Sequence, residues 1–391
     1  MLVGKKKSES SLKGKHQRMK RYGNIYEKIC TIENLKLAHK MARKDKLFYA
    51  EVKMVDENPD FYLRRIQKML VSGSYKVSEY TISAINDKGK TRELAKLPYY
   101  PDRIIQWAIM LQIEPVFKEV FCAHSCASIP ERGISKASKI LKKQLRDVEN
   151  TRYCLQIDVK KFYPSIDRTI LKQMLRKKFK DRRLLDLLDQ IIDSAPGDSG
   201  VPIGSYLSQY LANFYLTYLD HWIKEVLKVK SVVRYMDDMT ILCKRKEDLH
   251  LIRLAIQCFL HKHLNLTLKR NFQVYPVESR GISFVGFRFF HKFTLLRKGT
   301  CKRLKGRFLK FLEKHNAGQL LNRKEFCSAG SYNGWLRLCD GYRLWQKYIK
   351  PVIPAMVKYY KEVILKDLPE PKKTNKIIKF RNKVQKGKVA A

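Results

Sequence analysis

Two aspartates lie side by side in the stretch Ser231-Val-Val-Arg-Tyr-Met-Asp-Asp-Met-Thr-Ile-Leu-Cys243, between runs of apolar and β-branched residues. This pattern is typical of two strands joined by a tight acidic turn. Paired carboxylates repel each other and one pKa rises unless a cation lies between them, so Asp237 and Asp238 indicate a metal site. Asp is also a common turn residue, so this stretch alone leaves the purely structural interpretation open.

A second strand is predicted over Arg152-Tyr-Cys-Leu-Gln-Ile-Asp-Val159, which alternates in polarity and reaches Asp158 near its end. Helices are expected over residues 205–227 and 246–264, on either side of the hairpin. The order strand, helix, hairpin, helix, strand resembles a split βαβ plan with an antiparallel sheet. Asp158 would then converge with the acidic pair at one sheet edge, where carboxylates can hold two Mg²⁺ ions about 4 Å apart for nucleotidyl transfer.

Composition favours a polyanionic partner. The 391 residues include 81 Lys+Arg and 37 Asp+Glu, which gives a formal net charge of +44. Because such an excess repels itself, nucleic acid is the expected partner. The positive charge is spread along the chain, no apolar run approaches the ~20 residues of a spanning helix, and the start does not resemble a signal peptide, so we expect a cytoplasmic protein without membrane contact.

The nine cysteines are scattered, which is typical of reduced thiols. Cys122 and Cys126 are spaced as a zinc ligand pair would be, but no second pair follows, so packing is the favoured interpretation. Basic tails over residues 1–24 and 369–391 are expected to be mobile and solvated.

The ordered motifs resemble the reverse transcriptase superfamily. Ile157-Asp-Val-Lys-Lys-Phe-Tyr163 is similar to its first palm motif, Pro202-Ile-Gly-Ser-Tyr-Leu-Ser-Gln209 to the second, and Tyr235-Met-Asp-Asp238 to the third. The segment Phe284-Val285-Gly286-Phe287 is similar to the primer grip. The resemblance implies an α+β right-hand polymerase with fingers at 25–150 (with part of the palm), a palm built on a split βαβ antiparallel sheet at 151–290, and a helical thumb at 291–368.

The resemblance also implies residue roles. Asp158 and Asp237 would bridge two Mg²⁺ ions, for which Mn²⁺ is a substitute, with Asp238 assisting and the Val159 carbonyl as a further ligand. Tyr163 would exclude a 2′-hydroxyl and so favour deoxynucleotides, although filling the core is the alternative. Arg92 and Lys96 would contact the triphosphate, with a solvated position as the alternative. Leu264-Asn-Leu-Thr-Leu-Lys269 is similar to the fourth motif of the family, in which a lysine donates a proton to the departing pyrophosphate. That lysine aligns with Phe272, so the donor stays open between Lys269 and Arg270.

The second motif resembles that of diversity-generating retroelements. Most reverse transcriptases have Gln-Gly-x-x-x-Ser-Pro where this chain has Ile203-Gly204-Ser-Tyr-Leu-Ser208-Gln209. Such bacterial or phage-encoded enzymes copy a template-repeat RNA into cDNA with frequent errors at adenines, assisted by an accessory variability protein. Ile203 offers no hydrogen bond to the template or the incoming dNTP, so loss of about 1.4 kcal/mol of discrimination would raise errors tenfold. Strand-end packing is the other interpretation of Ile203.

Other functions remain open at this level. A group II intron-derived, retron or phage-defence reverse transcriptase would share the same palm motifs. A non-catalytic RNA-binding protein could keep a polymerase fold, but it would not need Asp158, Asp237 and Asp238 together. An RNA template, an RNA/DNA heteroduplex and dNTPs are the expected partners of each enzyme interpretation.

Overall fold

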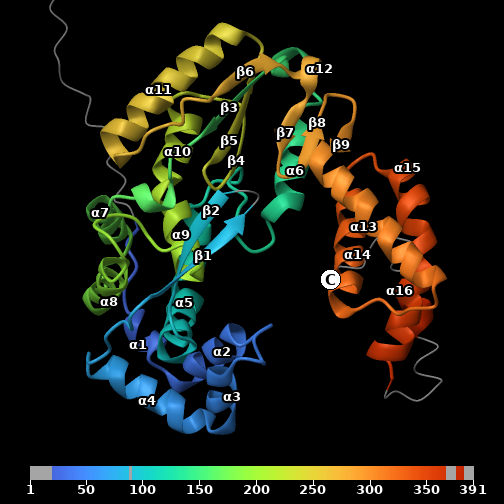
Figure 1. Cartoon of the computed structure of the whole chain (residues 1–391). Helices are drawn as coiled ribbons and strands as arrows, with labels where there is room; N and C mark the ends of the chain where they lie inside the picture. Colours follow the sequence, from blue (N-terminus) through green and yellow to red (C-terminus); the bar gives the residue numbers. More distant parts are fainter. Residues whose placement is uncertain (1–19, 88–89, 367–375, 383–391) are drawn as a thin grey trace, which may run out of the picture. The chain divides into compact units, whose positions relative to one another are not determined.

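The computed structural model describes residues 20–87, 90–366 and 376–382. The described chain falls into two compact units, and each is assembled from segments that are distant in sequence (Figure 1). The first unit is drawn from Met1–Phe121, Lys161–Tyr218 and Lys262–Leu266. The second is drawn from Cys122–Lys160, Leu219–His261 and Thr267–Ala391.

The first unit packs its helices around α5 (Ile104–Val120), whose residues Ile104, Ile105 and Ile109 are fully buried. Trp107 of α5 stacks on Tyr206 of α9 with ring centroids 4.5 Å apart. An antiparallel hairpin of β1 (Thr81–Asp87) and β2 (Lys90–Lys96) belongs to the same unit. Its other helices are α1 (Tyr26–Ile29), α2 (Ile32–Ala42), α3 (Ala50–Glu57), α4 (Pro59–Val71), α7 (Arg168–Lys178), α8 (Arg182–Asp193) and α9 (Tyr206–Tyr215).

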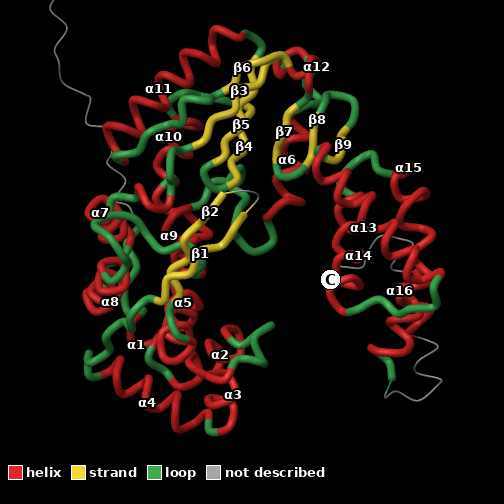
Figure 2. Tube along the Cα trace, in the orientation of Figure 1, coloured by secondary structure: helices red, strands yellow, loops and turns green. Residues whose placement is uncertain are grey.

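The second unit contains a four-stranded antiparallel sheet in the order β4-β5-β3-β6 (Figure 2). The strands are β3 (Tyr153–Asp158), β4 (Ser231–Tyr235), β5 (Asp238–Cys243) and β6 (Gln273–Pro276). Helix α6 (Gly133–Gln144) packs against β4. Helix α11 (Lys246–Leu264) contacts α10 (Thr217–Glu225) through Phe259 and Trp222, whose ring centroids are 4.6 Å apart. The prediction of an antiparallel sheet is confirmed, as is the helix over residues 246–264.

A three-stranded sheet and a helical segment complete the second unit. The sheet orders β7 (Ile282–Phe284), β8 (Phe287–Phe289) and β9 (Thr294–Leu296), after the short α12 (Val277–Arg280). The helices that follow are α13 (Lys298–Asn316), α14 (Arg323–Leu336), α15 (Tyr342–Leu344) and α16 (Ile353–Tyr359). Short 3-10 segments of the second unit cover Glu149–Thr151 and Lys350–Val352, and π-helical turns cover Trp345–Ile349 and Tyr360–Ile364. In the first unit, Tyr163–Ser165 is a 3-10 segment, and Tyr99–Arg103 is kinked at Tyr100, whose backbone is extended (φ −109°, ψ 129°). Phe284, Phe289 and Phe308 are buried in the shared core.

Two sequence predictions are wrong. Residues 205–227 do not form one helix, because α9 ends before Leu216 and the Thr217 hydroxyl donates to the Asn213 carbonyl at 3.1 Å, which competes with the regular helix bond. The C-terminal tail is not wholly solvated either. Residues 376–382 are helical, and Phe380 is 6% exposed and stacks on Tyr360 with centroids 4.1 Å apart, since aromatic burial outweighs the surrounding charge.

The N-terminal tail prediction concerns residues 1–24, of which 1–19 lie outside the described part of the chain. Among the residues that the structure describes, no helix combines the length and apolar character needed to cross a membrane.

Candidate active site

The acidic residues meet at one end of the four-stranded sheet. Asp158 is the last residue of β3 and pairs directly with Asp238, the first residue of β5. Side chains of directly opposed residues point to the same face of a sheet, so both carboxylates lie on one face. Tyr235 pairs with Asp238, so Met236 and Asp237 alone form the loop between β4 and β5. The structure therefore brings together the three carboxylates that the sequence singled out.

The loop backbone adopts a demanding conformation. Met236 has φ of 57°, the left-handed sign that two-residue hairpin turns require and that Gly or Asn usually supplies. A bulky residue keeps this conformation only where its surroundings hold it, and such strain is concentrated at functional sites.

A buried ion pair holds the loop. The Arg234 and Asp220 side chains are 0% and 1% exposed. Arg234 Nε donates to Asp220 Oδ1 at 2.8 Å and its Nη2 donates to Oδ2, while Nη1 donates to the Met236 carbonyl at 2.8 Å. One guanidinium thus joins α10 to the strained residue next to Asp237. We infer that Arg234 is a positioning residue for the acidic turn.

The environment of Asp220 keeps this pair ionised. Burial alone would raise the pKa of Asp220, but the Arg234 guanidinium and then His124 lower it to about 2. His124 Nε2 lies 3.4 Å from Asp220 Oδ1. The His124 carbonyl accepts the Arg234 backbone N–H at 2.9 Å, which ties the residue to the sheet edge.

The catalytic candidates themselves resist ionisation. Burial raises the pKa of Asp237 to about 7, and the neighbouring Asp158 carboxylate contributes. Burial also raises the pKa of Asp238 to about 7, with the charges of Asp158 and Asp237 as further causes. Lys269 opposes both shifts, but it does not cancel them. A cation bound among these carboxylates would relieve the repulsion.

Asp158 shows where such a cation fits. Its Oδ2 accepts an ion-paired hydrogen bond from Lys269 Nζ, and its carbonyl accepts the Lys269 backbone N–H at 2.8 Å. Its other oxygen, Oδ1, is buried and has no hydrogen-bond partner among the described residues. Because buried polar atoms are normally satisfied, this oxygen is available to a ligand.

The donor set consists of hard oxygens, which suit Mg²⁺ or Mn²⁺. Within the described ranges, no group of three or more His, Cys, Asp or Glu side chains is arranged to hold a metal by itself, and this includes the Cys122–Cys126 region. That finding is compatible with Mg²⁺, which is usually held by one or two carboxylates together with substrate phosphates. Asp158 and Asp237, with Asp238 beside them and the Val159 carbonyl next in the chain, fit that kind of site.

Removing two of these charges is expected to stabilise the metal-free protein at alkaline pH. In the folded state the pKa values of Asp237 and Asp238 are about 7, above the ~4 of an unfolded chain. The folded state therefore binds more protons between these values, and stability falls as pH rises through that window. Asp237→Asn/Asp238→Asn should raise the free energy of unfolding by roughly 1 kcal/mol at pH 8, after allowance for solvent screening of half-buried groups, and change it little at pH 4. Urea titrations in EDTA at both pH values measure this, and no gain at pH 8 would contradict it.

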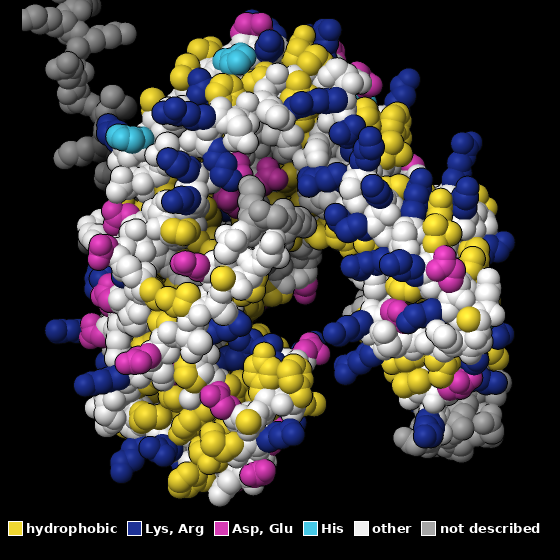
Figure 3. Space-filling model, viewed as in Figure 1, with side chains coloured by type: hydrophobic (Ala, Val, Ile, Leu, Met, Phe, Trp, Pro, Cys, Tyr) yellow, Lys and Arg dark blue, Asp and Glu magenta, His cyan; other side chains and the backbone are white. Residues whose placement is uncertain are grey.

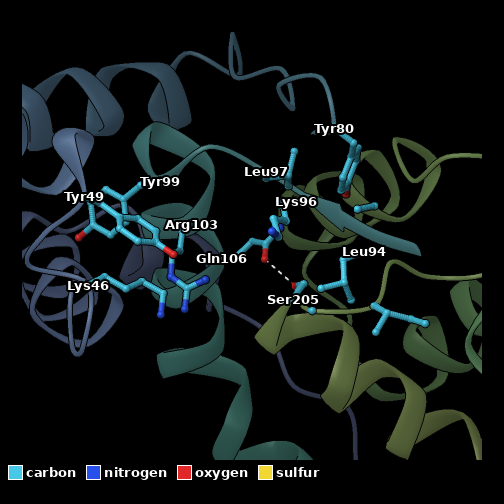
Figure 4. Close-up of a pocket in the computed structure, with 13 residues that line it drawn as sticks. Lys46, Tyr49, Tyr80, Leu94, Lys96, Leu97, Tyr99, Arg103, Gln106 and Ser205 are labelled. Atoms are coloured by element: carbon cyan, nitrogen blue, oxygen red, sulfur yellow. Dashed lines mark hydrogen bonds between the residues drawn. The ribbon is translucent and has the colours of Figure 1, made fainter. Parts of the chain in front are cut away.

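Three residues predicted to bind nucleotide line one cavity of the first unit. The cavity has a volume of about 300 Å³ and includes Lys96, Ile203 and Gly204 (Figure 4). Gly204 has φ of 113°, which a side chain would disfavour, and this places its backbone open to a ligand. Lys46, Tyr49, Tyr80, Leu94, Ala95, Leu97, Tyr99, Arg103, Gln106 and Ser205 complete the lining.

Ser205 fixes the position of the second motif at this cavity. Its Oγ donates to Gln106 Oε1 at 2.7 Å and accepts the Ser208 backbone N–H at 3.3 Å, so it caps α9 while it is tied to α5. Ser208 is buried at 4% exposure and, like Gln209, does not line the cavity. Both were predicted to bind nucleotide, and the structure places them on α9 behind the lining residues Ile203 and Gly204.

Tyr163 and Arg92 were the other predicted nucleotide contacts. Tyr163 begins the 3-10 turn Tyr163–Ser165 and is half-buried. Its carbonyl accepts the Val201 N–H at 3.1 Å, and a Cβ on Gly200 would lie 2.7 Å from that same carbonyl oxygen, so only glycine permits this close approach. Arg92 lies on β2, but its side chain is outside the described part.

The predicted primer grip is a rigid turn between β7 and β8. Phe284 and Phe287 are fully buried, whereas Val285 and Gly286 have φ of 41° and 90°. A Cβ on Gly286 would lie 2.6 Å from the Trp335 ring, so the turn sits directly against α14. Phe272, which the resemblance aligned with the family's motif-four lysine, lies 4.3 Å from the Arg253 guanidinium, measured to the ring centroid. Of the two residues considered as proton donor, Lys269 contacts Asp158.

Helix α13 presents a basic face. Leu304, Phe308 and Phe311 are buried on one side of this helix. Figure 3 shows Lys and Arg side chains gathered over this part of the second unit. The exposed basic residues of α13 include Lys302, Arg303, Lys305, Arg307 and Lys310. Such a row suits the phosphate backbone of a nucleic acid, which is bound through charge.

Comparison with known proteins identifies the family to which this chain belongs. Residues 83–289, more than half of the chain, match the family described as reverse transcriptase (RNA-dependent DNA polymerase). The chain therefore belongs to the reverse transcriptase family. Its class of enzyme is that of the RNA-directed DNA polymerases.

The individual relatives share little sequence identity with this chain. Protein YkfC of Escherichia coli (strain K12) is 24% identical over 273 residues, which cover 59% of this chain and 71% of that protein. The group II intron-encoded protein LtrA of Lactococcus lactis subsp. cremoris is 24% identical over 314 residues, which cover 62% of this chain and 51% of LtrA, so the chain spans about half the length of that relative. Among solved structures, apo telomerase from Candida tropicalis, truncated from its C-terminal domain, has a TM-score of 0.42 and 13% identity and covers 59% of this chain and 58% of that one.

The sequence did not single out Lys46, Arg103 or the Asp220–Arg234 pair. Lys46 is one of many cations in a basic chain, and Arg103 lies in the stretch Tyr100–Trp107, which resembles the fingers of group II intron-type enzymes but assigns this arginine no role. Arg234 carried a signal that could have been used, because a charged residue inside the apolar run Val232 to Tyr235 must find a buried partner.

Proposed function

We propose that this chain makes cDNA from an RNA template by two-metal nucleotidyl transfer at Asp158 and Asp237. The observation that carries the proposal is the register of β3 and β5, which sets Asp158 opposite Asp238 with Asp237 next to it. Membership of the reverse transcriptase family supports the same reaction.

In this proposal, the four-stranded sheet is the polymerase palm, residues 25–150 supply the fingers with part of the palm, and the thumb begins at residue 291. The basic face of α13 supports a thumb that follows the RNA/DNA heteroduplex by charge and shape. The turn from Phe284 to Phe287 would act as the primer grip.

Asp158 and Asp237 would hold the two Mg²⁺ ions, with Asp238 and the Val159 carbonyl assisting. When bound, these ions would supply Lewis-acid activation of the primer hydroxyl and charge stabilisation at the leaving phosphate. The chain's own groups orient the reaction. Arg234 keeps Asp237 in the turn, and Lys269 fixes one Asp158 oxygen so that the other faces the site. The primer 3′-hydroxyl loses its proton to solvent and its oxygen forms a bond to the α-phosphorus of the dNTP. The bond between that phosphorus and the α,β-bridging oxygen breaks, and pyrophosphate leaves with the electron pair.

Tyr163 would select the deoxyribose of the incoming dNTP, and Arg92 and Lys96 would contact its triphosphate. Lys96 shares a cavity with Ile203 and Gly204, which supports a common nucleotide site. Ser208 and Gln209 would act through the position of α9. Lys269 is engaged with Asp158, which leaves Arg270 as the other candidate to donate a proton to pyrophosphate.

We further propose that the enzyme diversifies a target gene by copying a template-repeat RNA with frequent errors at adenines, together with an accessory variability protein. The aliphatic side chain of Ile203 in the cavity lining supports this. The Ile203 side chain forms no hydrogen bond, whereas a Gln side chain could donate one and accept one. A polar contact of this kind can discriminate strongly between correct and incorrect nucleotides.

Ile203→Gln is expected to lower misincorporation opposite template adenine about tenfold, because one hydrogen bond worth about 1.4 kcal/mol changes an error ratio by that factor. Deep sequencing of cDNA from an RNA of known sequence measures the error at each base. Ile82→Gln is the matched control, since Ile82 is 58% exposed on β1 and does not line the cavity. An unchanged error spectrum in Ile203→Gln would rule out this role for Ile203.

A group II intron-derived reverse transcriptase is the second candidate, favoured by the likeness to LtrA. The same sequencing separates the two. Errors concentrated at template adenines in the wild type support diversification, and uniform low errors support the intron-type enzyme. A folded wild type that binds RNA but never extends a primer would point to a non-catalytic RNA-binding protein instead.

A further inference from the structure

The cavity of the first unit holds a pair of cations that the proposed function does not use. Lys46 follows α2, and Arg103 directly precedes α5. In Figure 4 their nitrogen atoms lie side by side, next to the rings of Tyr49 and Tyr99. Lys96, Ile203 and Gly204 line another part of the same cavity.

Hydrogen bonds hold Arg103 and the neighbouring Tyr99 in place. Arg103 Nε donates to the Ala42 carbonyl at 3.3 Å, which ties the guanidinium to the end of α2. The Tyr99 hydroxyl lies 2.7 Å from His39 Nδ1, and His39 Nε2 lies 2.8 Å from Asp56 Oδ1. Tyr99 is therefore fixed by hydrogen bonds that leave its ring as part of the cavity wall.

Among the residues that the structure describes, none that lines the cavity is Asp or Glu. The ion pair at the end of α2 joins Asp56 to Arg43 and involves neither Lys46 nor Arg103. Burial lowers the pKa of Lys46, and the positive charge of Arg103 lowers it further, while Asp45 opposes these effects only in part. Burial also lowers the pKa of Arg103. Two half-buried like charges side by side are unfavourable, and a bound anion would reverse that.

We propose that Lys46 and Arg103 bind a phosphate group of a nucleotide, through contacts additional to those expected from Arg92 and Lys96. Guanidinium and ammonium groups together provide a fork and a point charge for phosphate oxygens. A cavity of about 300 Å³ with tyrosine rings in its wall has room for a nucleotide unit. The inference rests on the proposed function, because it takes the ligand to be either the template RNA backbone or the incoming dNTP.

Binding measurements on the full-length chain test this without catalysis. One arm measures fluorescence anisotropy of a labelled single-stranded RNA over a range of KCl concentrations. The other measures binding of a labelled, complementary dNTP to the protein on an RNA template whose primer ends in a dideoxynucleotide. Lys46→Gln and Arg103→Gln remove the charges, Lys46→Arg keeps one, and Lys53→Gln on α3 is the control, since Lys53 is exposed and lies outside the cavity lining.

We expect Lys46→Gln to weaken binding about tenfold in one arm, because a charge-assisted hydrogen bond contributes about that factor. Lys46→Arg should restore most of it, and Lys53→Gln should behave as the wild type. If RNA binding is weakened, and the slope of log K against log salt concentration is about 0.7 shallower, the ligand is a template phosphate. A weakened dNTP arm identifies the incoming nucleotide.

Affinities of Lys46→Gln within twofold of the control in both arms would overturn the inference. Arg103→Gln removes the hydrogen bond to the Ala42 carbonyl, so this variant could fail to fold. Lys46→Gln breaks no described hydrogen bond, and its affinities therefore decide the test on their own. Thermal unfolding monitored by circular dichroism shows whether each of the two variants is folded. A wild type that binds neither ligand would instead refute the proposed function, so the two failures are distinguishable.

Discussion

Asp237→Ala is expected to lower the rate of nucleotide addition on an RNA template at least about 10³-fold, because it removes several kcal/mol of transition-state stabilisation from a two-metal site. The protein should remain folded, since the burial of Asp237 already opposes its charge. Binding of the heteroduplex should change little, because the basic surface of α13 is untouched.

Single-turnover extension of a labelled primer gives the rate constant, and heteroduplex binding is measured beside it. Asp198→Ala is the matched control, since Asp198 is an exposed turn residue of the first unit. A loss of less than tenfold would remove Asp237 from the proposed centre. Equal losses of rate and of heteroduplex affinity would indicate a structural defect instead.

Arg234→Met is expected to destabilise the protein by about 3–5 kcal/mol, because it removes the guanidinium from a buried carboxylate and leaves Asp220 with His124 alone. The same change removes the hydrogen bond to the Met236 carbonyl. Urea unfolding of Arg234→Met and of Arg234→Met/Asp220→Leu separates these two effects. Replacing both partners by apolar residues is often neutral or stabilising, so the double variant should recover most of the lost stability.

The double variant isolates the positioning role of Arg234. If the guanidinium holds the acidic turn, kcat of Arg234→Met/Asp220→Leu stays at least about tenfold low while KM for dNTP and the free energy of unfolding are near the wild-type values, which corresponds to about 1.4 kcal/mol lost only in the transition state. Arg234→Lys should recover part of kcat. A double variant with both wild-type stability and wild-type kcat would show that Arg234 serves the fold alone.

The sequence predicted the elements whose pattern is local. Alternation of polar and apolar residues up to Asp158 located β3, and the acidic turn located the β4–β5 hairpin. The helix over residues 246–264 was predicted with the observed bounds, because its charges and apolar residues follow one helical period. The antiparallel pairing followed from the order of these elements, so the proximity of Asp158 to Asp238 could be predicted as well.

What could not be predicted depends on contacts between distant segments. Lys46 and Arg103 come together because α2 packs against α5, and neither segment shows in its sequence that the two cations share a cavity. The end of α9 before Leu216 is accompanied by a hydrogen bond from the Thr217 hydroxyl to the Asn213 carbonyl, which helical periodicity does not reveal. Burial of Phe380 required an aromatic partner, Tyr360, that periodicity does not reveal.

The most direct measurement is primer extension on an RNA template with dNTPs and Mg²⁺, with the wild type and Asp158→Asn run side by side. Asp158→Asn keeps the shape of the side chain at the end of β3 and removes its charge. We expect full-length cDNA from the wild type, none without Mg²⁺, and none from Asp158→Asn under the same conditions. Equal cDNA synthesis by both proteins would contradict the assignment of the reaction to this carboxylate cluster.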